Sequence, residues 1–480
     1  MELCAEIQDI IERKKGKILT LSDQIWDLAE VGLTEHKSKA VYEAYLKEEG
    51  FEVTTPVDYL PTSFMATYGH GKPVIGITGE YDALPGFSQK ANALSKEPSA
   101  ENPSAGHACG HNLLGAGALT AAVAVKEYLQ AHGTSGTVVL LGTPSEERDA
   151  GKAFMAKEGV FKDLDVAFTW HPEYKTQVWS SGTLANIIVK FQFTGTPAHA
   201  AAAPERGRSA LDAAELMNVG VNFLREQIIS TARIHYAFTD VGGEAPNVVQ
   251  PSSSLLYFIR APKLRDATSI YERVRKIAHG ACEMTETTVE EEFQLAVSDF
   301  IANKVLSKLM YESATELGAP AYTEDEIKTA QSYYHTLSDA EKESTDQLLK
   351  SNFDEETYQA ITETCICNHV FPYSETAPVL SGSTDVGDLS YCVPTAQMLV
   401  ATEALGTTLH SWQMASQGKT SLAKKGMLYA GAIIALSAVK VLTNPEIAAQ
   451  AQAELARELG PAGYVSPIPA DVKVRDTSIE

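Results

Sequence analysis

Histidine, cysteine and carboxylate residues gather in four short segments of the chain, and a fifth follows much later. The stretch GHACGH places His107, Cys109 and His111 at alternate positions just before an apolar run. The segments GEYDALP, TPSEE, TWHPE and GTTLHSW add Glu80, Asp82, Glu146, Glu147, His171, Glu173 and His410. A thiol beside two imidazoles is compatible with packing, with a redox device or with half of a metal site, so this spacing alone leaves the choice open.

Each of these residues also has an ordinary structural interpretation. A single histidine near a strand end is commonly a hydrogen-bonded core residue, and paired glutamates commonly face water. Recurrence favours chemistry, because four successive segments each supply His, Cys, Asp or Glu and none places Lys or Arg at its centre. Converging thiolate, imidazole and carboxylate groups without a neighbouring cation indicate a metal site.

The bulk composition limits the classes of function. The 480 residues carry a formal net charge of −23 and are 44% hydrophobic and 21% charged, as in ordinary globular proteins. Such an acidic chain repels nucleic-acid phosphates, so nucleic acid is not an expected partner. The sequence contains no uninterrupted run of about 18 apolar residues, so no membrane span is predicted. With no recognisable signal peptide, we expect a cytoplasmic protein whose six cysteines are reduced thiols.

Strands that alternate with helices must position these segments. Helical periodicity covers 23–30 and 38–49, an alanine-rich helix is predicted over 113–129, and apolar runs that begin as strands lie at 63–69, 73–85, 136–147 and 164–173. Residues 86–105 form a long polar loop. Because the apolar runs end in polar residues, they predict an α/β sheet with a site at its strand ends. A buried strand at 395–403 and a final amphipathic helix at 420–441 complete this part.

The pattern changes between residues 184 and 297. Strands are predicted at 184–195, 232–242, 253–262 and 287–297, with helices at 209–227 and 266–285, which is the ferredoxin-like split βαβ pattern. We therefore expect a catalytic domain in two parts, 1–183 and 298–480, with a lid or dimerisation domain inserted at 184–297. The acidic stretch 322–356 predicts a helical excursion at the surface, and the tail from 461 is expected to lie along the surface.

The order of the motifs resembles that of the M20 metallopeptidase family. Asp-Ala-Leu-Pro, His-x-Cys-x-His, Glu-Glu, His-Pro and a distant His follow one another as in its amidohydrolase branch, in which Cys replaces an Asp of other members. The stretches AHAAAAPERGRSALDA, PNVVQP, STDVGDLSY and LHSWQMASQGKTSLAKKGM extend the match over almost the whole chain. The resemblance implies a mixed-sheet catalytic domain of the zinc-peptidase type with an inserted α+β ferredoxin-like lid.

For the site, the resemblance implies a pair of divalent ions, Zn or Mn. The matching ligand positions are Cys109, His111, Glu147, His171 and His410, with the Cys109 thiolate bridging the ions. Asp82 matches an Asp that orients a ligating His. Glu146 is the expected general base, which takes a proton from water and passes it to the departing amine. His107 is left with a packing or supporting role, and Glu80 stands where many members have a ligating His and is not assigned to the ions.

The resemblance also assigns roles in the lid. His199 matches a residue that stabilises the reaction oxyanion from the partner subunit, although its loop is also compatible with a plain surface turn. Asn247 and Arg260 match positions that contact substrate, and Arg260 is suited either to clamping a carboxylate or to a salt bridge. The implied assembly is a homodimer, or a pair with a homologous A subunit.

The expected reaction is hydrolysis of the amide bond of an N-acyl amino acid. The leading substrate is p-aminobenzoyl-glutamate, which would give p-aminobenzoate and glutamate, and the alternatives are a dipeptide or another acyl-amino-acid conjugate. A non-catalytic partner subunit is a second class of function, but the complete ligand set and Glu146 argue against it. A zinc nucleobase deaminase is set aside because its PCxxC segment is missing.

Overall fold

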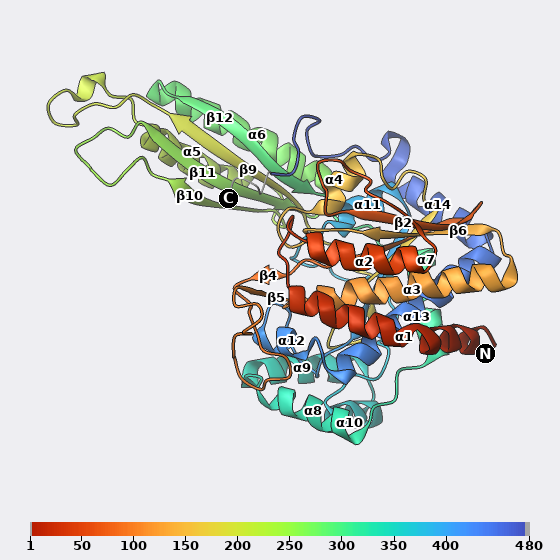
Figure 1. Ribbon diagram of the computed structural model, residues 1–480. Coiled ribbons are helices and arrows are strands. Elements are labelled where there is room, and N and C mark those ends of the chain that lie inside the picture. Colours follow the sequence, from red (N-terminus) through yellow and green to blue (C-terminus); the bar gives the residue numbers. More distant parts are fainter. Residues whose placement is uncertain (1, 476–480) are drawn as a thin grey trace.

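The computed structural model describes residues 2–475 and consists of a large α/β unit from which a narrower α+β unit projects (Figure 1). The larger unit is built on a seven-stranded mixed sheet with the order β1-β2-β6-β3-β7-β13-β8. Its strands are β1 (Glu52–Thr54), β2 (Phe64–His70), β3 (Val74–Gly79), β6 (Gly136–Gly142), β7 (Val166–Glu173), β8 (Gln177–Val178) and β13 (Thr395–Ala401).

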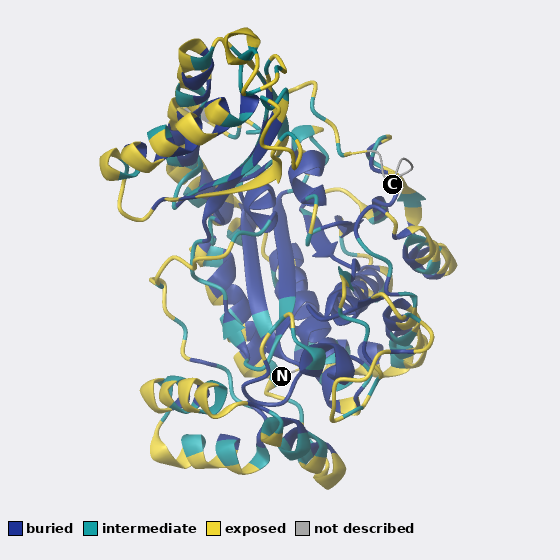
Figure 2. Ribbon diagram, turned by 90° about the vertical axis from the view of Figure 1, so that its left-hand side faces the viewer, coloured by how far each residue is buried: buried dark blue, intermediate teal, exposed yellow. Residues whose placement is uncertain are grey.

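The four central strands β6, β3, β7 and β13 run parallel to one another, whereas β2 pairs with β6 in the antiparallel sense. Parallel strands must be covered on both faces, and their sequences are accordingly apolar throughout. Figure 2 shows the central strands of the large unit buried along most of their length. All four therefore end at the same edge of the sheet, where the polar segments of the sequence follow them.

Long helices cover one face of this sheet. They are α1 (Glu2–Leu28), α3 (His111–His132), α13 (Ser421–Thr443) and α7 (Lys304–Leu317), with α2 (His36–Glu48) and α14 (Glu446–Leu459) at their sides. Two short helices, α4 (Gly151–Lys157) and α11 (Val386–Cys392), pack against the other face. The prediction of a helix starting at residue 23 was too short, because α1 begins at Glu2.

Helix α13 differs from the prediction for 420–441. It is long and apolar enough to cross a membrane by length and composition alone, yet 83% of its most apolar window is buried inside the protein. It packs between α1, α3 and α7, which is why nearly every side of it is apolar instead of one stripe. It is also not the last helix, because α14 follows it.

The projecting unit, which we call the lid, contains β9 (Ala185–Thr194), α5 (Ala210–Leu224), β10 (Arg233–Asp240), β11 (Ser252–Ala261), α6 (Leu264–Thr285) and β12 (Thr288–Val297). Its strands pair in the order β10-β11-β9-β12 and are antiparallel throughout. This order and the two helices on one face are those of the predicted ferredoxin-like pattern. The lid has its own apolar core, to which Ala153 and Phe154 of α4 contribute.

Two peripheral segments complete the chain. The acidic excursion forms α8 (Glu324–His335), α9 (Asp339–Asn352) and α10 (Glu355–Thr364), which pack near the short helix α12 (Trp412–Gln417). The two-residue strands β4 (Leu84–Pro85) and β5 (Ala105–Gly106) bracket the long loop that was predicted there. The C-terminal tail does not lie wholly on the surface, because its apolar Ile468 is buried against the lid core.

Candidate metal centre

The chemical segments lie at the carboxyl edge of the parallel strands. Glu80 follows β3, Glu146 and Glu147 follow β6, and His171 stands near the end of β7. Helix α3 begins at His111 directly after Gly110, whose φ of +76° suits glycine. A Cβ at Gly110 would lie 2.4 Å from the Met414 side chain, so glycine also permits the close approach of these segments.

Three groups of side chains bring their ligand atoms within 4.8 Å of one another. The groups are Cys109, His111 and His171; Cys109, Glu147 and His410; and Glu80, His111 and Glu146. The first two share Cys109 and together contain all five side chains that the sequence motifs select. Residues separated by up to about 300 positions in the chain therefore converge on one thiol.

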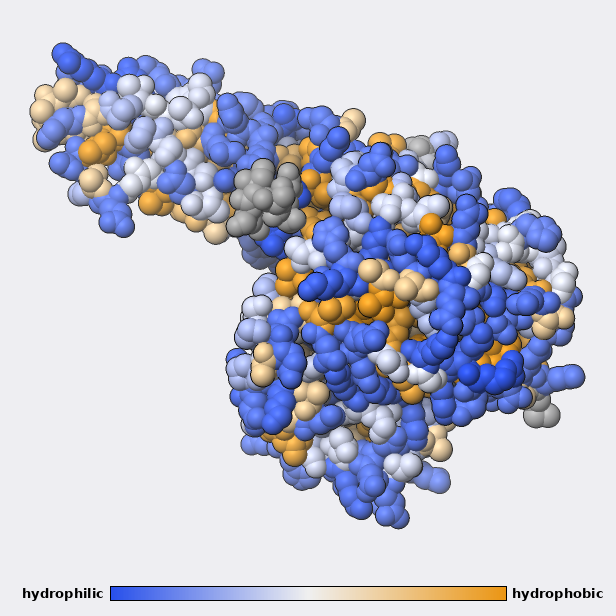
Figure 3. Space-filling model, in the orientation of Figure 1, coloured by the Kyte–Doolittle hydropathy of each residue, from blue (hydrophilic) through white to orange (hydrophobic). Residues whose placement is uncertain are grey.

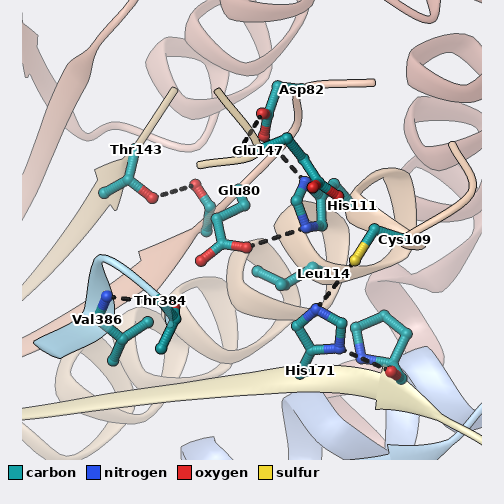
Figure 4. A network of polar contacts seen from close by, with 12 residues as sticks. Glu80, Asp82, Cys109, His111, Leu114, Thr143, Glu147, His171, Thr384 and Val386 are labelled. Carbon is teal, nitrogen blue, oxygen red and sulfur yellow. Dashed lines mark hydrogen bonds and ion pairs between the residues drawn. The ribbon is translucent and has the colours of Figure 1, made fainter. Parts of the chain in front are cut away.

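Hydrogen bonds orient the two buried imidazoles. His111 Nδ1 lies 2.9 Å from Asp82 Oδ1, and His171 Nδ1 lies 2.7 Å from the carbonyl oxygen of Pro172 (Figure 4). Each Nδ1 therefore donates a proton to oxygen, which leaves the lone pair of Nε2 directed inward. His171 Nε2 lies 3.4 Å from Cys109 Sγ, and the buried His111 Nε2 lies 3.2 Å from Glu80 Oε2. Ligating histidines are typically held in this way by a carboxylate or a carbonyl.

The remaining members are held by one another. The second oxygen of Asp82 accepts the backbone N–H of Glu147 at 3.0 Å, so one carboxylate positions both Glu147 and His111. Glu147 Oε1 lies 3.1 Å from His410 Nε2. The backbone of His410 and of Ser145, which precedes Glu146, adopts left-handed φ values of +57° and +56°. Such conformations are costly for residues other than glycine and are concentrated at functional sites.

The pKa values of the cluster are those of a pocket crowded with acids. Burial, followed by the charges of Glu80, Asp385 and Glu147, raises the pKa of Glu146 well above its usual value. Burial also raises the pKa of the Cys109 thiol. Burial by itself lowers the pKa of His111, but Cys109 and Asp82 outweigh it and raise this pKa. Divalent cations would relieve this crowding and favour the thiolate and carboxylate forms.

Sequence reasoning missed a buried cation at the cluster. Lys152 on α4 is fully buried, and its Nζ lies 2.7 Å from Glu80 Oε1 and 2.6 Å from Asp385 Oδ1. The four segments themselves place no Lys or Arg at their centres, but the neighbouring helix α4 supplies this cation. Lys152 follows Glu146 by only six residues, but nothing in the short sequence GKAFMAK indicates that its ammonium group points inward.

Two other predicted residues behave as supports or packing. Asp82 makes the expected hydrogen bond to a cluster histidine. His107 Nε2 lies 3.0 Å from the carbonyl oxygen of Ile25, and its buried ring is absent from all three groups. His107 therefore packs against α1 instead of joining the cluster.

The lid residues divide between its two ends. Arg260 stands at the end of β11 that joins the large unit, where its Nη1 lies 3.4 Å from Ser383 Oγ and its Nε has no hydrogen-bond partner. His199 and Asn247 lie on adjacent loops at the opposite end: His199 bridges Val248, and the carbonyl oxygen of Asn247 accepts the N–H of Ala200. The structure does not place Asn247 and Arg260 around one site.

The distance along the lid explains this separation. Strand β9 starts near the large unit at Ala185 and runs ten residues to Thr194, a span of about 33 Å. His199 follows five residues later, in the loop after β9, and the lid projects away from the large unit that holds Cys109 (Figure 1). Its Nδ1 accepts the backbone N–H groups of Ala201 and Ala202 at 3.2 and 3.1 Å. Its Nε2–H is therefore left as a donor on an exposed ring.

The sheet with its strand-end cluster and the inserted lid define a metallohydrolase of mixed α/β architecture. The sequence model of the peptidase family M20/M25/M40 matches residues 76–416, and the chain belongs to this family. It is 43% identical to one of the subunits of p-aminobenzoyl-glutamate hydrolase from Escherichia coli K12 over 475 residues, which cover 98% of each chain.

Solved structures show the same fold. An aminobenzoyl-glutamate utilization protein from Klebsiella pneumoniae superposes with a TM-score of 0.57 at 18% identity, covering 88% of this chain and 98% of its own. The Bacillus subtilis YXEP protein, described as a dinuclear metal-binding peptidase of the M20 family, gives a TM-score of 0.56 at 15% identity, covering 91% and 99%.

Proposed function

We propose that this chain is a metal-dependent amidohydrolase that cleaves p-aminobenzoyl-glutamate to p-aminobenzoate and glutamate. The observation that carries the proposal is the pair of ligand groups that share Cys109. A thiolate shared by two such groups suits two divalent ions held side by side. The identity to the Escherichia coli hydrolase subunit over nearly the full length of both chains supports the substrate. A dipeptide or another acyl-amino-acid conjugate is the second candidate.

The residues fit a pair of Zn²⁺ or Mn²⁺ ions. Cys109, His111 and His171 would hold one ion, and Cys109, Glu147 and His410 the other. Thiolate, imidazole and carboxylate groups are the ligand types that such ions take. When bound, the ions supply Lewis acidity for the amide carbonyl and promote the ionisation of water.

Glu146 is suited to move the proton. It lies half-buried beside the cluster residues, belongs to neither of the two groups that share Cys109, and has a raised pKa. A carboxylate whose pKa is raised above its usual value is a stronger base toward the attacking water. The same group then delivers the proton to the nitrogen of the departing amine. Arg260, whose guanidinium faces Ser383 instead of an acid, would bind a carboxylate of the substrate.

We further propose that the active form is a dimer joined through the lids. His199 and Asn247 lie too far from their own cluster to act there, so they would complete the site of a partner. Lid residues expose large apolar side chains, among them Val219 at 49%, Phe223 at 72% and Phe238 at 38%. Figure 3 shows hydrophobic residues among hydrophilic ones at the far end of the lid. The partner would be a second copy or a homologous subunit.

We propose a cytoplasmic location because the cysteines are free thiols. All six cysteines are free, and five of them are buried. A reducing compartment preserves such thiols, above all the one at the centre of the cluster.

The proposal is tested by metal loading and a substrate panel. Purified protein is loaded with Zn²⁺ or Mn²⁺, analysed for bound ions, and assayed on p-aminobenzoyl-glutamate, other N-acyl amino acids and dipeptides. We expect two ions per chain, loss of turnover with a chelator, and the highest kcat/KM for p-aminobenzoyl-glutamate. A higher kcat/KM for a dipeptide would favour the second candidate, and a protein that binds no ion would contradict both.

A further inference from the structure

The third group of converging side chains shares His111 with the proposed five-ligand centre, but its two glutamates are not among the five ligands. It consists of Glu80, His111 and Glu146. Glu80 Oε2 lies 3.2 Å from His111 Nε2 (Figure 4), while the other oxygen, Oε1, lies 2.7 Å from Lys152 Nζ. Both residues are almost wholly buried, so water does not screen this contact. The two oxygens of Glu80 therefore face two different partners.

The contact between Glu80 and His111 calls for a positive charge. The Nδ1–H of His111 is directed at Asp82, so the neutral ring presents a lone pair at Nε2. A lone pair and a carboxylate oxygen repel each other unless a proton or a metal ion lies between them, so the position between these two atoms suits a bound ion that takes the place of a proton. Two ligands of one ion, each about 2.0–2.2 Å from it at tetrahedral or octahedral angles, lie about 3.0–3.5 Å apart. The separation of 3.2 Å falls within this interval.

A buried ion pair fixes the Glu80 carboxylate in this position. Lys152 Nζ contacts Glu80 and, at 2.6 Å, Asp385 Oδ1, while Asp385 Oδ2 accepts the backbone N–H of Lys152 at 2.9 Å. Lys152 and Asp385 are both fully buried, and Ala153 and Phe154 beside Lys152 pack in the lid core. Burying an ammonium group costs several kcal/mol unless its partners compensate. This arrangement leaves the Glu80 carboxylate little freedom to rotate.

We infer that Glu80 is a further ligand of the ion held by His111, and that Lys152 and Asp385 are positioning residues that hold its carboxylate. The inference rests on the proposed metal centre and adds a sixth protein ligand to it. Lys152 also offsets the negative charge that a further carboxylate brings to the centre. The ion at His111 is then bound more tightly and with a higher coordination number than the five-ligand set allows.

The test is ion binding, measured without turnover. Wild-type protein and the variants Glu80→Gln and Lys152→Met/Asp385→Asn are loaded with Zn²⁺, and the affinity of each ion is measured by competition with a chelator. The visible absorption of the Co²⁺-loaded proteins reports coordination number. The double variant removes both charges of the pair, so neither is left buried alone, and thermal unfolding verifies that each variant is folded.

Glu80→Gln should weaken the binding of one of the two ions at least about 100-fold. The amide of Gln is a poor ligand, and its N–H group can occupy the lone pair of His111 Nε2. The Co²⁺ spectrum should change with it. The double variant keeps Glu80 but removes the ion pair that holds its carboxylate. Its affinity for the same ion should fall about 10–100-fold. Glu403→Gln is the matched control, because Glu403 is a buried strand-end carboxyl with an unpartnered oxygen outside all three groups, and its ion binding should equal wild type.

The outcomes separate this inference from the proposed function. Two ions bound by wild type, with unchanged affinity and Co²⁺ spectrum in Glu80→Gln, would overturn the ligand assignment while leaving the hydrolase intact. If Glu80→Gln binds the ion more weakly and the double variant binds it as wild type does, the positioning role of Lys152 and Asp385 is overturned. If the double variant does not fold, Glu80→Gln still decides the ligand assignment. Wild-type protein that binds no ion would overturn the proposed metal centre, and this inference with it.

Discussion

The large unit and the lid differ in whether they bury ionisable side chains. Within residues 185–297 no Asp, Glu, His, Lys or Arg side chain is buried, whereas the large unit buries Glu80, Asp82, His111, Lys152 and Asp385 around one thiol. Buried ionisable groups destabilise a fold unless they are paired, so their concentration in one place indicates chemistry. The lid, in contrast, has an ordinary apolar core and carries His199 and Asn247 on exposed loops at its tip.

This contrast indicates that the two regions contribute to catalysis differently. The cluster of the large unit is assembled within one chain by the strand ends. The tip residues of the lid, His199 and Asn247, are held in place by backbone hydrogen bonds but face no site of their own chain. In the proposed dimer the lid would carry these donors toward a second subunit, so variants of the two regions should fail in different ways.

The largest effect is expected in the large unit. Glu146→Gln should lower kcat by about 10²–10⁴-fold, because the amide cannot accept a proton from water. Both ions should stay bound, as metal analysis of the purified variant would show. Its neighbour provides the matched comparison: Glu147→Gln should lose bound ion as well as activity. Near-normal turnover in Glu146→Gln would show that another group is the base.

The lid tip should respond less strongly and across subunits. His199→Ala should lower kcat by about 10²-fold with unchanged ion content, since it removes one oxyanion donor. Mixing it with Glu146→Gln should restore activity, because a hybrid dimer contains one site with both residues intact. Random exchange would restore up to about a quarter of wild-type activity in a two-fold dimer. If mass spectrometry shows that the subunits have exchanged and activity is still absent, His199 does not act in a partner's site.

Arg260 at the near end of the lid should affect binding more than turnover. Arg260→Ala should raise KM for p-aminobenzoyl-glutamate about 10-fold or more, because a hydrogen-bonded carboxylate loses its charged partner. Arg233 is directly opposite on β10 and donates to backbone carbonyls, so Arg233→Ala serves as the control. Equal steady-state constants for the two variants would indicate that Arg260 has no contact with substrate.

The smallest effect concerns stability and pH. Burial raises the pKa of Asp388 on α11 to about 6. Because the folded state binds this proton more tightly than the unfolded state, the contribution is present below about pH 4 and is lost as pH rises through 6. Relative to Asp388→Asn, wild type should lose about 3 kcal/mol of unfolding free energy over this range.

Denaturant unfolding between pH 4 and 8 measures this difference. Asp240 in the lid is the contrasting residue, because its hydrogen bond from Ser252 lowers its pKa. Its contribution has the opposite sign: it is present above the unfolded pKa and lost as pH falls through the folded one. Parallel stability curves for wild type and Asp388→Asn would contradict the assignment of the raised pKa to Asp388.

Much of the molecule was accessible from local sequence. Alternating and continuous apolar runs located β2, β3, β6, β7 and the four lid strands. The reason is that the pattern of apolar residues over neighbouring positions indicates which side chains of a strand are buried. The errors followed from packing. Helix α13 was taken for amphipathic, and it is surrounded by other helices that its own sequence does not describe.

The sequence by itself determined the chemistry that is available: the order of the motifs, the family to which they belong, and Cys109 with the four other side chains grouped with it. Only the tertiary structure decided that Lys152 and Asp385, 233 positions apart, meet beside Glu80, and that His199 and Arg260 stand at opposite ends of the lid. The physical reason is that residue types and local periodicity are properties of neighbouring positions. Burial, pairing of charges and reach depend on contacts between distant segments, which exist only once the chain has folded.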